Sequence, residues 1–201
     1  MPVRLVLASR NTHKIAELRF FLSGLSIEVL SLEDFPWVPS LIEDGATFEE
    51  NATKKALQAF GAVNLPVLAD DSGLEVFYLN GRPGVYSARY AGEPASDAAN
   101  NERLLREMRG VAPRRRRAQF RAVLALVVPG ASELAQGVCP GTVAEEPRGT
   151  NGFGYDPIFV PDGSSKTYAE LTQDEKNAIS HRSRAFANMR GLIETRLLHA
   201  K

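Results

Sequence analysis

Two adjacent aspartates that follow a short apolar run are the first candidates for chemistry. Residues 67–69 have the character of a buried strand and lead directly into Asp70 and Asp71. Neighbouring carboxylates repel each other, and Asp is depleted in strands. Two interpretations are open. Either the acids bind a cation or orient a water at the carboxyl end of a strand, or residues 70–73 form a turn stabilised by side-chain-to-backbone hydrogen bonds.

A second acidic pair lies just before a predicted helix start. Glu43 and Asp44 precede Thr47, and Glu50 follows Thr47 by three positions, which is the spacing of a capping box. Mg²⁺ is typically bound by one or two protein carboxylates, waters and substrate phosphate oxygens. The structural alternative is that carboxylates are favourable near a helix N-terminus without any ligand. Glu50 and Lys54 are four positions apart and are expected to form a surface ion pair.

A polar stretch between a predicted strand and a predicted helix has residue types that suit a phosphate site. Apolar residues 3–8 predict the strand, and helical spacing begins after Lys14. Free backbone N–H groups at a helix start bind phosphate, and Lys14 adds positive charge there. The stretch lacks the glycines of a P-loop, and in the alternative Asn11 or Thr12 merely caps the helix. The candidate phosphate ligands are Ser9, Asn11 and Lys14.

A glycine-rich loop at residues 149–157 carries candidates for binding a nucleobase. Phe153 lies between two glycines and could stack on a base, a contact worth roughly 1–3 kcal/mol. The alternative is that the loop aromatics, Phe153 and Tyr155, pack into the core. Further along, Lys176 and residues 180–182 occupy different sides of a helical stretch. A ligand that they share has to be large, and a nucleotide is large enough.

Strand and helix patterns interleave along the chain and predict an α/β fold with a mixed sheet. The chain has 201 residues, enough for one large domain or two small lobes, and its pattern shows no repeat and no long linker. The strands are expected at residues 3–8, 27–30, 66–70, 74–78, 120–128, 134–138, 142–144 and 158–160. The helices are expected at residues 14–25, 47–60 and 96–108, with a final helix that follows a capping box at Thr172 and Glu175.

Composition excludes several classes of function. The formal net charge is zero, so attraction of the whole molecule to nucleic acid or to an anionic membrane is not indicated. The arginine run 114–117 is expected to be a solvated loop, because no aromatic residues interleave with it. The single Cys139 fits a reducing compartment, and no apolar leader opens the sequence, so a cytoplasmic protein is expected. His13 and His199 lack the spacing of a zinc site.

Six segments in order along the chain carry a family resemblance. They are LASRNTHK at 7–14, EDGATFEENA at 43–52, ADDSGL at 69–74, PGVYSARY at 83–90, GFGYDP at 152–157 and EKNAISHR at 175–182. Together they resemble the Ham1-like pyrophosphatases of non-standard purine nucleoside triphosphates. The resemblance implies one domain over residues 1–201, with a two-lobed α/β fold, a long mixed sheet and a cleft between the lobes. It also implies a homodimer and Mg²⁺-dependent hydrolysis of dITP, ITP or XTP to the monophosphate and pyrophosphate.

The resemblance also assigns roles to residues. Asp71 would be the base that activates water and a magnesium ligand, with Asp70 in support and Glu43 as a second metal ligand. Ser9, Asn11 and Lys14 would bind the triphosphate. Relatives often have glycine after Ser9, so Arg10 here either adds a phosphate contact or points away. The remaining substrate-binding residues that the resemblance implies are Thr12, His13, Ser72, Phe153, Gly154, Tyr155, Asp156, Lys176, His181 and Arg182.

Base selectivity has a physical explanation in this scheme. Inosine and xanthine carry a 6-keto acceptor where adenine has an amino donor, so donors from Arg182 or from backbone N–H groups would favour the keto bases. Guanine also has a 6-keto group and must be excluded at its 2-position. Two alternatives are a pyrophosphatase for other modified nucleotides and a nucleotide-binding regulator without turnover. The paired acids and Lys14 argue against the regulator.

Overall fold

The computed structural model describes residues 2–94 and 96–199 of the chain. The chain forms two compact units, and three separate segments make up the first. The first unit comprises Met1–Asp71, Ala122–Gly137 and Arg182–Lys201. The second unit comprises Ser72–Arg121 and Val138–His181. The chain therefore passes from one unit to the other between Asp71 and Ser72, and again between His181 and Arg182, two positions at which candidate site residues lie.

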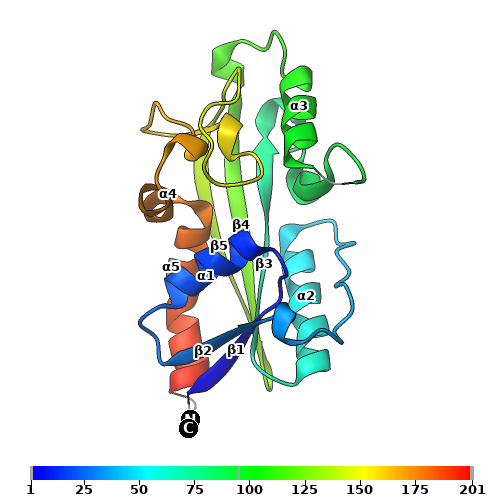
Figure 1. Cartoon of the computed structure of the whole chain (residues 1–201), viewed down its shortest axis with the longest axis vertical. Helices are drawn as coiled ribbons and strands as arrows, with labels where there is room; N and C mark the ends of the chain where they lie inside the picture. The colour runs from blue at the N-terminus through cyan, green and yellow to red at the C-terminus, as the bar shows by residue number, and fades with distance from the viewer. Residues whose placement is uncertain (1, 95, 200–201) are drawn as a thin grey trace. The chain divides into compact units, whose positions relative to one another are not determined.

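The α/β fold with a mixed sheet, expected from the sequence, is confirmed. Six strands form one sheet in the order β2-β1-β3-β4-β5-β6 (Figure 1). The strands are β1 Val3–Leu7, β2 Ile27–Ser31, β3 Val67–Val76, β4 Arg117–Val128, β5 Ala131–Val143 and β6 Phe159–Pro161. The helices are α1 Thr12–Leu22, α2 Phe48–Val63, α3 Asp97–Glu107, α4 Gln173–Ile179 and α5 His181–Ile193. Among the described residues, no helix is long and apolar enough to cross a membrane.

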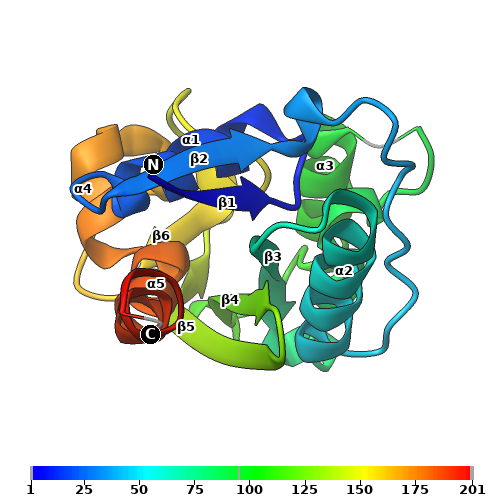
Figure 2. The same cartoon turned by 90° about the horizontal axis from the view of Figure 1, so that it is seen from below.

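The first unit contains the parallel part of the sheet. β1 pairs in parallel with both β2 and β3, and Figure 2 shows β1 and β2 side by side. Apolar residues of β1, α1, β4 and α5 form one buried cluster that covers the sheet in this unit. Thr47 caps α2 as the sequence predicts, because its side chain accepts a hydrogen bond from the Glu50 N–H at 3.1 Å. The sheet fixes the positions of Asp70 and Asp71, which lie on β3, and the capped helix α2 fixes the position of the acidic segment before it.

The second unit has its own core, which is rich in aromatic residues. Phe120, Phe159 and Tyr168 pack against one another with ring centroids 4.7 to 5.7 Å apart. His181 stacks on Phe120 at a centroid distance of 4.7 Å and an interplanar angle of 10°. α4 begins with the predicted capping box, in which Thr172 and Glu175 each accept a hydrogen bond from the other's backbone N–H. This core supports the glycine-rich loop that precedes β6.

Three predictions of local structure were wrong. β3 runs without a break from Val67 to Val76, so the two expected strands 66–70 and 74–78 are one strand, and the turn interpretation of residues 70–73 does not hold. The two expected strands 134–138 and 142–144 are one strand, β5, and the expected final helix is two helices that break at Ser180. In β3 and β5, glycines weaken the strand pattern of the sequence without ending the strand, because pairing with neighbouring strands continues through them. The final helix differs from its prediction through a local break in the backbone at Ser180.

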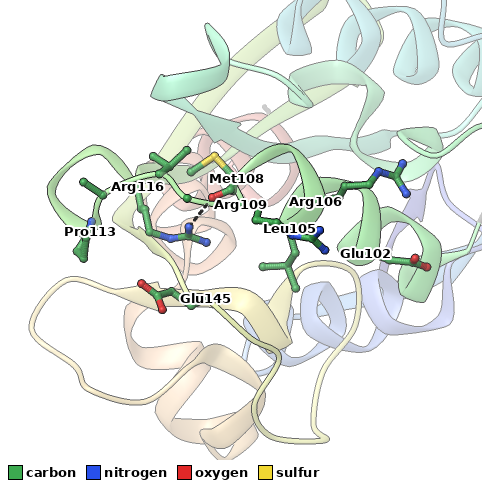
Figure 3. A pocket seen from close by; sticks show the side chains of 11 residues that line it. Glu102, Leu105, Arg106, Met108, Arg109, Pro113, Arg116 and Glu145 are labelled. Atoms are coloured by element: carbon green, nitrogen blue, oxygen red, sulfur yellow. Dashed lines mark hydrogen bonds between the residues drawn. The ribbon is translucent and has the colours of Figure 1, made fainter.

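The arginine run 114–117 is not a fully solvated loop, because Arg116 is buried with 5% of its surface exposed. Its guanidinium donates to the carbonyls of Met108, Val143 and Ala144 at 2.6 to 2.8 Å. Figure 3 shows Arg116 between Met108 and Glu145 at a cavity of about 550 Å³. Burial lowers the pKa of Arg116, although Glu145 opposes this shift. Arg116 therefore joins the end of α3 to the end of β5.

Candidate active site

The candidate site residues fall into two sets, one on each unit. The set on the first unit is built around the two aspartates of β3, both almost fully buried at 4% and 6% exposure. Consecutive residues of a strand point to opposite faces of the sheet. Accordingly, Asp70 and Asp71 have different partners. Their carboxylates are adjacent in the sequence but lie on opposite faces of β3, which reduces their mutual repulsion.

Asp70 is surrounded by cations. Its Oδ2 lies 2.8 Å from the Lys14 Nζ and 3.4 Å from the Arg182 Nε, and Arg182 also binds Glu17 at 3.0 Å. Burial by itself would raise the pKa of Asp70, but Lys14 and Arg182 outweigh it and hold that pKa well below its usual value. Asp70 is therefore an ionised anchor for Lys14 at the start of α1.

Asp71 faces a buried lysine that the sequence interpretation missed. The Lys55 Nζ donates to Asp71 Oδ1 at 2.9 Å and lies 3.0 Å from Glu43 Oε1. It also donates to the backbone carbonyl of Asp70 at 2.8 Å. Burial raises the pKa of Asp71 more than the nearby lysines lower it, so this carboxyl is a stronger base than an exposed Asp. Burial opposes the charge on Lys55, but Asp71 and Glu43 raise its pKa overall.

A signal for Lys55 was present in the sequence. α2 buries Ala52, Ala56 and Ala59, and Lys55 lies three positions after the first and four before the last, on the same face. A charged residue on an apolar helical stripe indicates a buried partner. The neighbouring Lys54 is exposed and pairs with Asp44 at 2.8 Å, not with Glu50 as predicted. Asp44 is thus part of a surface pair, which favours Glu43 over Asp44 as a metal ligand.

The residues around Asp71 fit a divalent cation. The second oxygen of Asp71, Oδ2, is buried and has no hydrogen-bond partner among the described residues. A buried carboxylate oxygen without a donor is costly unless something else binds it. In residues 2–94 and 96–199, no group of three or more His, Cys, Asp or Glu side chains is arranged to hold a metal. A donor set of Asp71 and Glu43 matches the one or two protein carboxylates that Mg²⁺ uses when phosphates complete its shell.

The polar stretch before α1 has both structural and binding features. Asn11 caps α1, since its side chain accepts from the Lys14 N–H at 3.1 Å, and the Asn11 N–H donates to Ser9 Oγ at 3.0 Å. Arg10 donates to the Val38 carbonyl at 2.6 Å, which attaches the turn to a following loop. Thr12 and His13 are exposed at the helix start. The capping alternative is confirmed for Asn11, and the helix start remains accessible for an anion.

The set on the second unit surrounds the glycine-rich loop. Asp156 Oδ2 accepts from the Phe153 N–H at 2.9 Å and from the Lys176 Nζ at 2.7 Å. Both partners of this ion pair are buried at 2% and 3% exposure. The Lys176 Nζ also lies 4.9 Å from the centre of the Phe153 ring, within the range of a cation–π contact. The loop conformation and the position of its aromatic ring are therefore coupled to a buried charge pair.

The two loop aromatics have different environments. Tyr155 is in the core, and its hydroxyl donates to the Ser87 carbonyl at 2.8 Å. Burial raises the pKa of Tyr155. Phe153 is only half-buried. The core-packing alternative therefore holds for Tyr155, whereas Phe153 keeps a face on which a base could stack. Ser72, which follows Asp71, is half-buried on β3.

Glu17 is a second buried charged residue that the interpretation of the sequence missed. Glu17 lies on α1 at 5% exposure, and its carboxylate is 3.0 Å from Arg182 Nη1. Arg182 is thus paired with two acids of the first unit, whereas His181 belongs to the core of the second. His181 and Arg182 are adjacent in the sequence, but their contacts lie in different units.

Comparisons with known proteins identify the family of the chain. The Ham1 family matches residues 5–192 of the chain. A dITP/XTP pyrophosphatase of Geobacter sulfurreducens is 53% identical over 185 residues, covering 92% of this chain and 93% of that protein. The dITP/XTP pyrophosphatase of Bacillus subtilis is 47% identical over 190 residues, covering 94% and 96%. A solved Ham1 protein structure from Coxiella burnetii has a TM-score of 0.88 at 43% identity, covering 96% and 99%. The chain belongs to the Ham1 family.

Proposed function

We propose that the chain hydrolyses dITP, ITP and XTP to the nucleoside monophosphate and pyrophosphate, with Mg²⁺ as cofactor. The observation that carries the proposal is the environment of Asp71. This carboxylate is buried, has a raised pKa and carries one oxygen without a hydrogen-bond partner, beside Glu43 and Lys55. A base of raised pKa is suited to taking a proton from water at neutral pH. The dITP/XTP activity of relatives near 50% identity supports the substrate class.

The residues of the first unit would perform the hydrolytic step. Asp71 would take a proton from the attacking water, whose oxygen forms a bond to the α-phosphorus as the bond to the bridging oxygen breaks and pyrophosphate leaves. Mg²⁺, held by Asp71 and Glu43, would neutralise charge on the phosphates and on the leaving pyrophosphate. Lys14, anchored by Asp70 at 2.8 Å, would bind the phosphates together with Ser9 and backbone N–H groups at the start of α1.

The residues of the second unit would recognise the base. Phe153 keeps an accessible face, and the buried Asp156–Lys176 pair holds the backbone on which the ring sits. We propose that the base stacks on Phe153 and that donors from His181 and from loop N–H groups bind its 6-keto oxygen. The two acids bound by Arg182 support a different role for that residue, which is to hold Asp70 in its ionised state.

Other parts of the proposal rest on the family. We propose that residues 1–201 act as one pyrophosphatase domain, that the protein functions as a homodimer and that it works in the cytoplasm. The net charge of zero supports a small-molecule substrate and not nucleic acid.

A substrate panel tests the proposed function. The purified chain is assayed with Mg²⁺ on dITP, XTP, dGTP, dATP and dUTP, and pyrophosphate and monophosphate are both quantified. We expect kcat/KM for dITP and XTP to exceed the value for dATP by at least about 100-fold, because an amino group opposes donors that a keto oxygen satisfies. Equal turnover of dATP and dITP would refute keto recognition, and preference for dUTP would favour the alternative of other modified nucleotides.

A further inference from the structure

Helix α3 holds one residue of the glycine-rich loop, Gly154, at both of its backbone polar groups. The Gly154 N–H donates to Asp97 Oδ2 at 2.6 Å, and the Gly154 carbonyl accepts from Asn101 Nδ2 at 2.9 Å. Asp97 is the first residue of α3, and Asn101 follows four positions later. Residues four apart lie on one face of a helix. The two side chains therefore bind both polar groups of a single residue, the one directly after Phe153.

The polar groups of Asn101 are not explained by packing. Asn101 is buried at 8% exposure, and its Oδ1 is buried without a hydrogen-bond partner among the described residues. An unpaired buried amide oxygen costs free energy, so an apolar residue would suit this helical position better if it only filled space. The opposite amide orientation would place two acceptor oxygens together, which fixes the Nδ2 as the atom that faces Gly154.

Phe153 is consequently held on both sides, at its own N–H and at the residue that follows it. Its own N–H is bound by Asp156, and the next residue is bound by α3. Gly154 has a φ of +61°, a conformation that residues other than glycine rarely adopt. A cavity of about 530 Å³ lies between α3 and the loop, so neighbouring side chains do not pack the loop tightly against the helix there. The two hydrogen bonds therefore set the position of the loop on this side.

We propose that Asp97 and Asn101 are positioning residues that hold the backbone N–H and carbonyl of Gly154, a pair of hydrogen bonds called the clamp below, and thereby preorganise Phe153 for base binding. The proposal rests on the proposed function for the role of Phe153. It assigns α3, which carries none of the candidate site residues, to substrate specificity. The clamp acts on the base end of the substrate alone, so its loss weakens binding of nucleotides and leaves the binding of a bare polyphosphate unchanged.

Two pairs of variants separate this role from general stability. Asp97→Asn and Asp97→Ala both remove the negative charge at the N-terminus of α3, so any loss of helix stability is common to them. Only Asp97→Ala also removes the acceptor oxygen for the Gly154 N–H. Asn101→Asp keeps the size of the side chain but places an acceptor against the Gly154 carbonyl. Glu102→Gln, an exposed change on the same helix, is the matched control.

The measurements are kcat and KM for dITP, and inhibition by inorganic tripolyphosphate, which has no base. In Asp97→Ala and Asn101→Asp we expect KM for dITP to rise roughly 5- to 100-fold, the equivalent of a lost stacking contact, with a smaller change in kcat. Tripolyphosphate inhibition stays unchanged, and Asp97→Asn and Glu102→Gln stay near the parent values. Equal weakening of tripolyphosphate, or an unchanged KM for dITP in both variants, would overturn the proposal.

Hydrogen exchange of the Gly154 amide keeps this test distinct from the test of the proposed function. By NMR on the unliganded chain, we expect this amide to be protected, and its exchange to accelerate by at least roughly tenfold in Asp97→Ala. An unprotected Gly154 amide in the parent chain would refute the clamp even if dITP is hydrolysed. A protected amide in a chain that does not hydrolyse dITP would leave the clamp standing but refute both the proposed function and the specificity role.

Discussion

Removing the buried charge of Lys55 should be one of the most destabilising single changes in the first unit. The Lys55 Nζ contacts Asp71, Glu43 and the Asp70 carbonyl at 2.8 to 3.0 Å, and only 5% of its side chain is exposed. Lys55→Met keeps the length of the side chain and removes the ammonium. The buried Asp71 carboxylate then loses its cation, and breaking a buried pair in this way costs about 3–5 kcal/mol.

Unfolding by urea, monitored by circular dichroism, measures the loss in free energy of unfolding. Thermal unfolding gives a second readout: for a chain of this size each kcal/mol shifts Tm by roughly 2–4 °C, so Tm should fall by about 6–20 °C. The adjacent Lys54 provides the control, because Lys54→Met removes an equal charge from an exposed pair with Asp44 and should change stability little.

A double variant tests whether the pair is the cause. Asp71→Asn removes the charge that Lys55 neutralises, so Lys55→Met in the Asp71→Asn background should cost less than in the parent chain. Equal losses for Lys54→Met and Lys55→Met would refute the reasoning, as would strictly additive effects of the two changes at residues 55 and 71.

Three further predictions concern the second unit. Burial and the hydrogen bond from its hydroxyl to Glu107 raise the pKa of Tyr90 to about 12. The neutral hydroxyl therefore stabilises the folded chain fully below the ordinary tyrosine pKa of about 10, and this stabilisation is lost as pH rises through 12. The free energy of unfolding should consequently differ less between pH 9 and pH 11 in Tyr90→Phe than in the parent chain. Gly152→Ala would place a Cβ in collision with Asp156 Oδ2 at a φ of +77°, and should raise KM for dITP through displacement of the loop, with an unchanged KM as the contrary result. Arg116→Lys should lower the unfolding free energy by about 1–3 kcal/mol, because one ammonium cannot reproduce the fork that serves three carbonyls; an unchanged urea midpoint would contradict this.

The sequence predicted local features whose causes are local. The capping box at Thr172 forms as predicted, because a cap depends on residues three positions apart. At Thr47 it forms in part: the Thr47 side chain accepts from the Glu50 N–H, but the Glu50 side chain accepts from the Ala46 N–H. Asn80-Gly81, a dipeptide typical of tight turns, has positive φ at both residues. The alternation of Asp70 and Asp71 to opposite partners follows from strand geometry alone.

Features that depend on contacts between distant residues were not predictable in this way. The partner of Lys55 lies 16 positions away on another element, and Glu17 meets Arg182 across 165 positions. The apolar stripe of α2 marks Lys55 as unusual but does not say which acid it meets. Arg116 shows the same limit, because a run of four arginines has the composition of a solvated loop, while burial of one member depends on the ends of α3 and β5.

Hydrolysis of dITP by the Asp71→Asn variant measures what the Asp71 carboxylate contributes to catalysis. With Mg²⁺ present, the parent chain should release equal amounts of dIMP and pyrophosphate, whereas Asp71→Asn should lower kcat by at least about 100-fold and still bind dITP, since Lys14 and Phe153 remain. Full activity of Asp71→Asn, or release of orthophosphate and dIDP by the parent chain, would contradict the account.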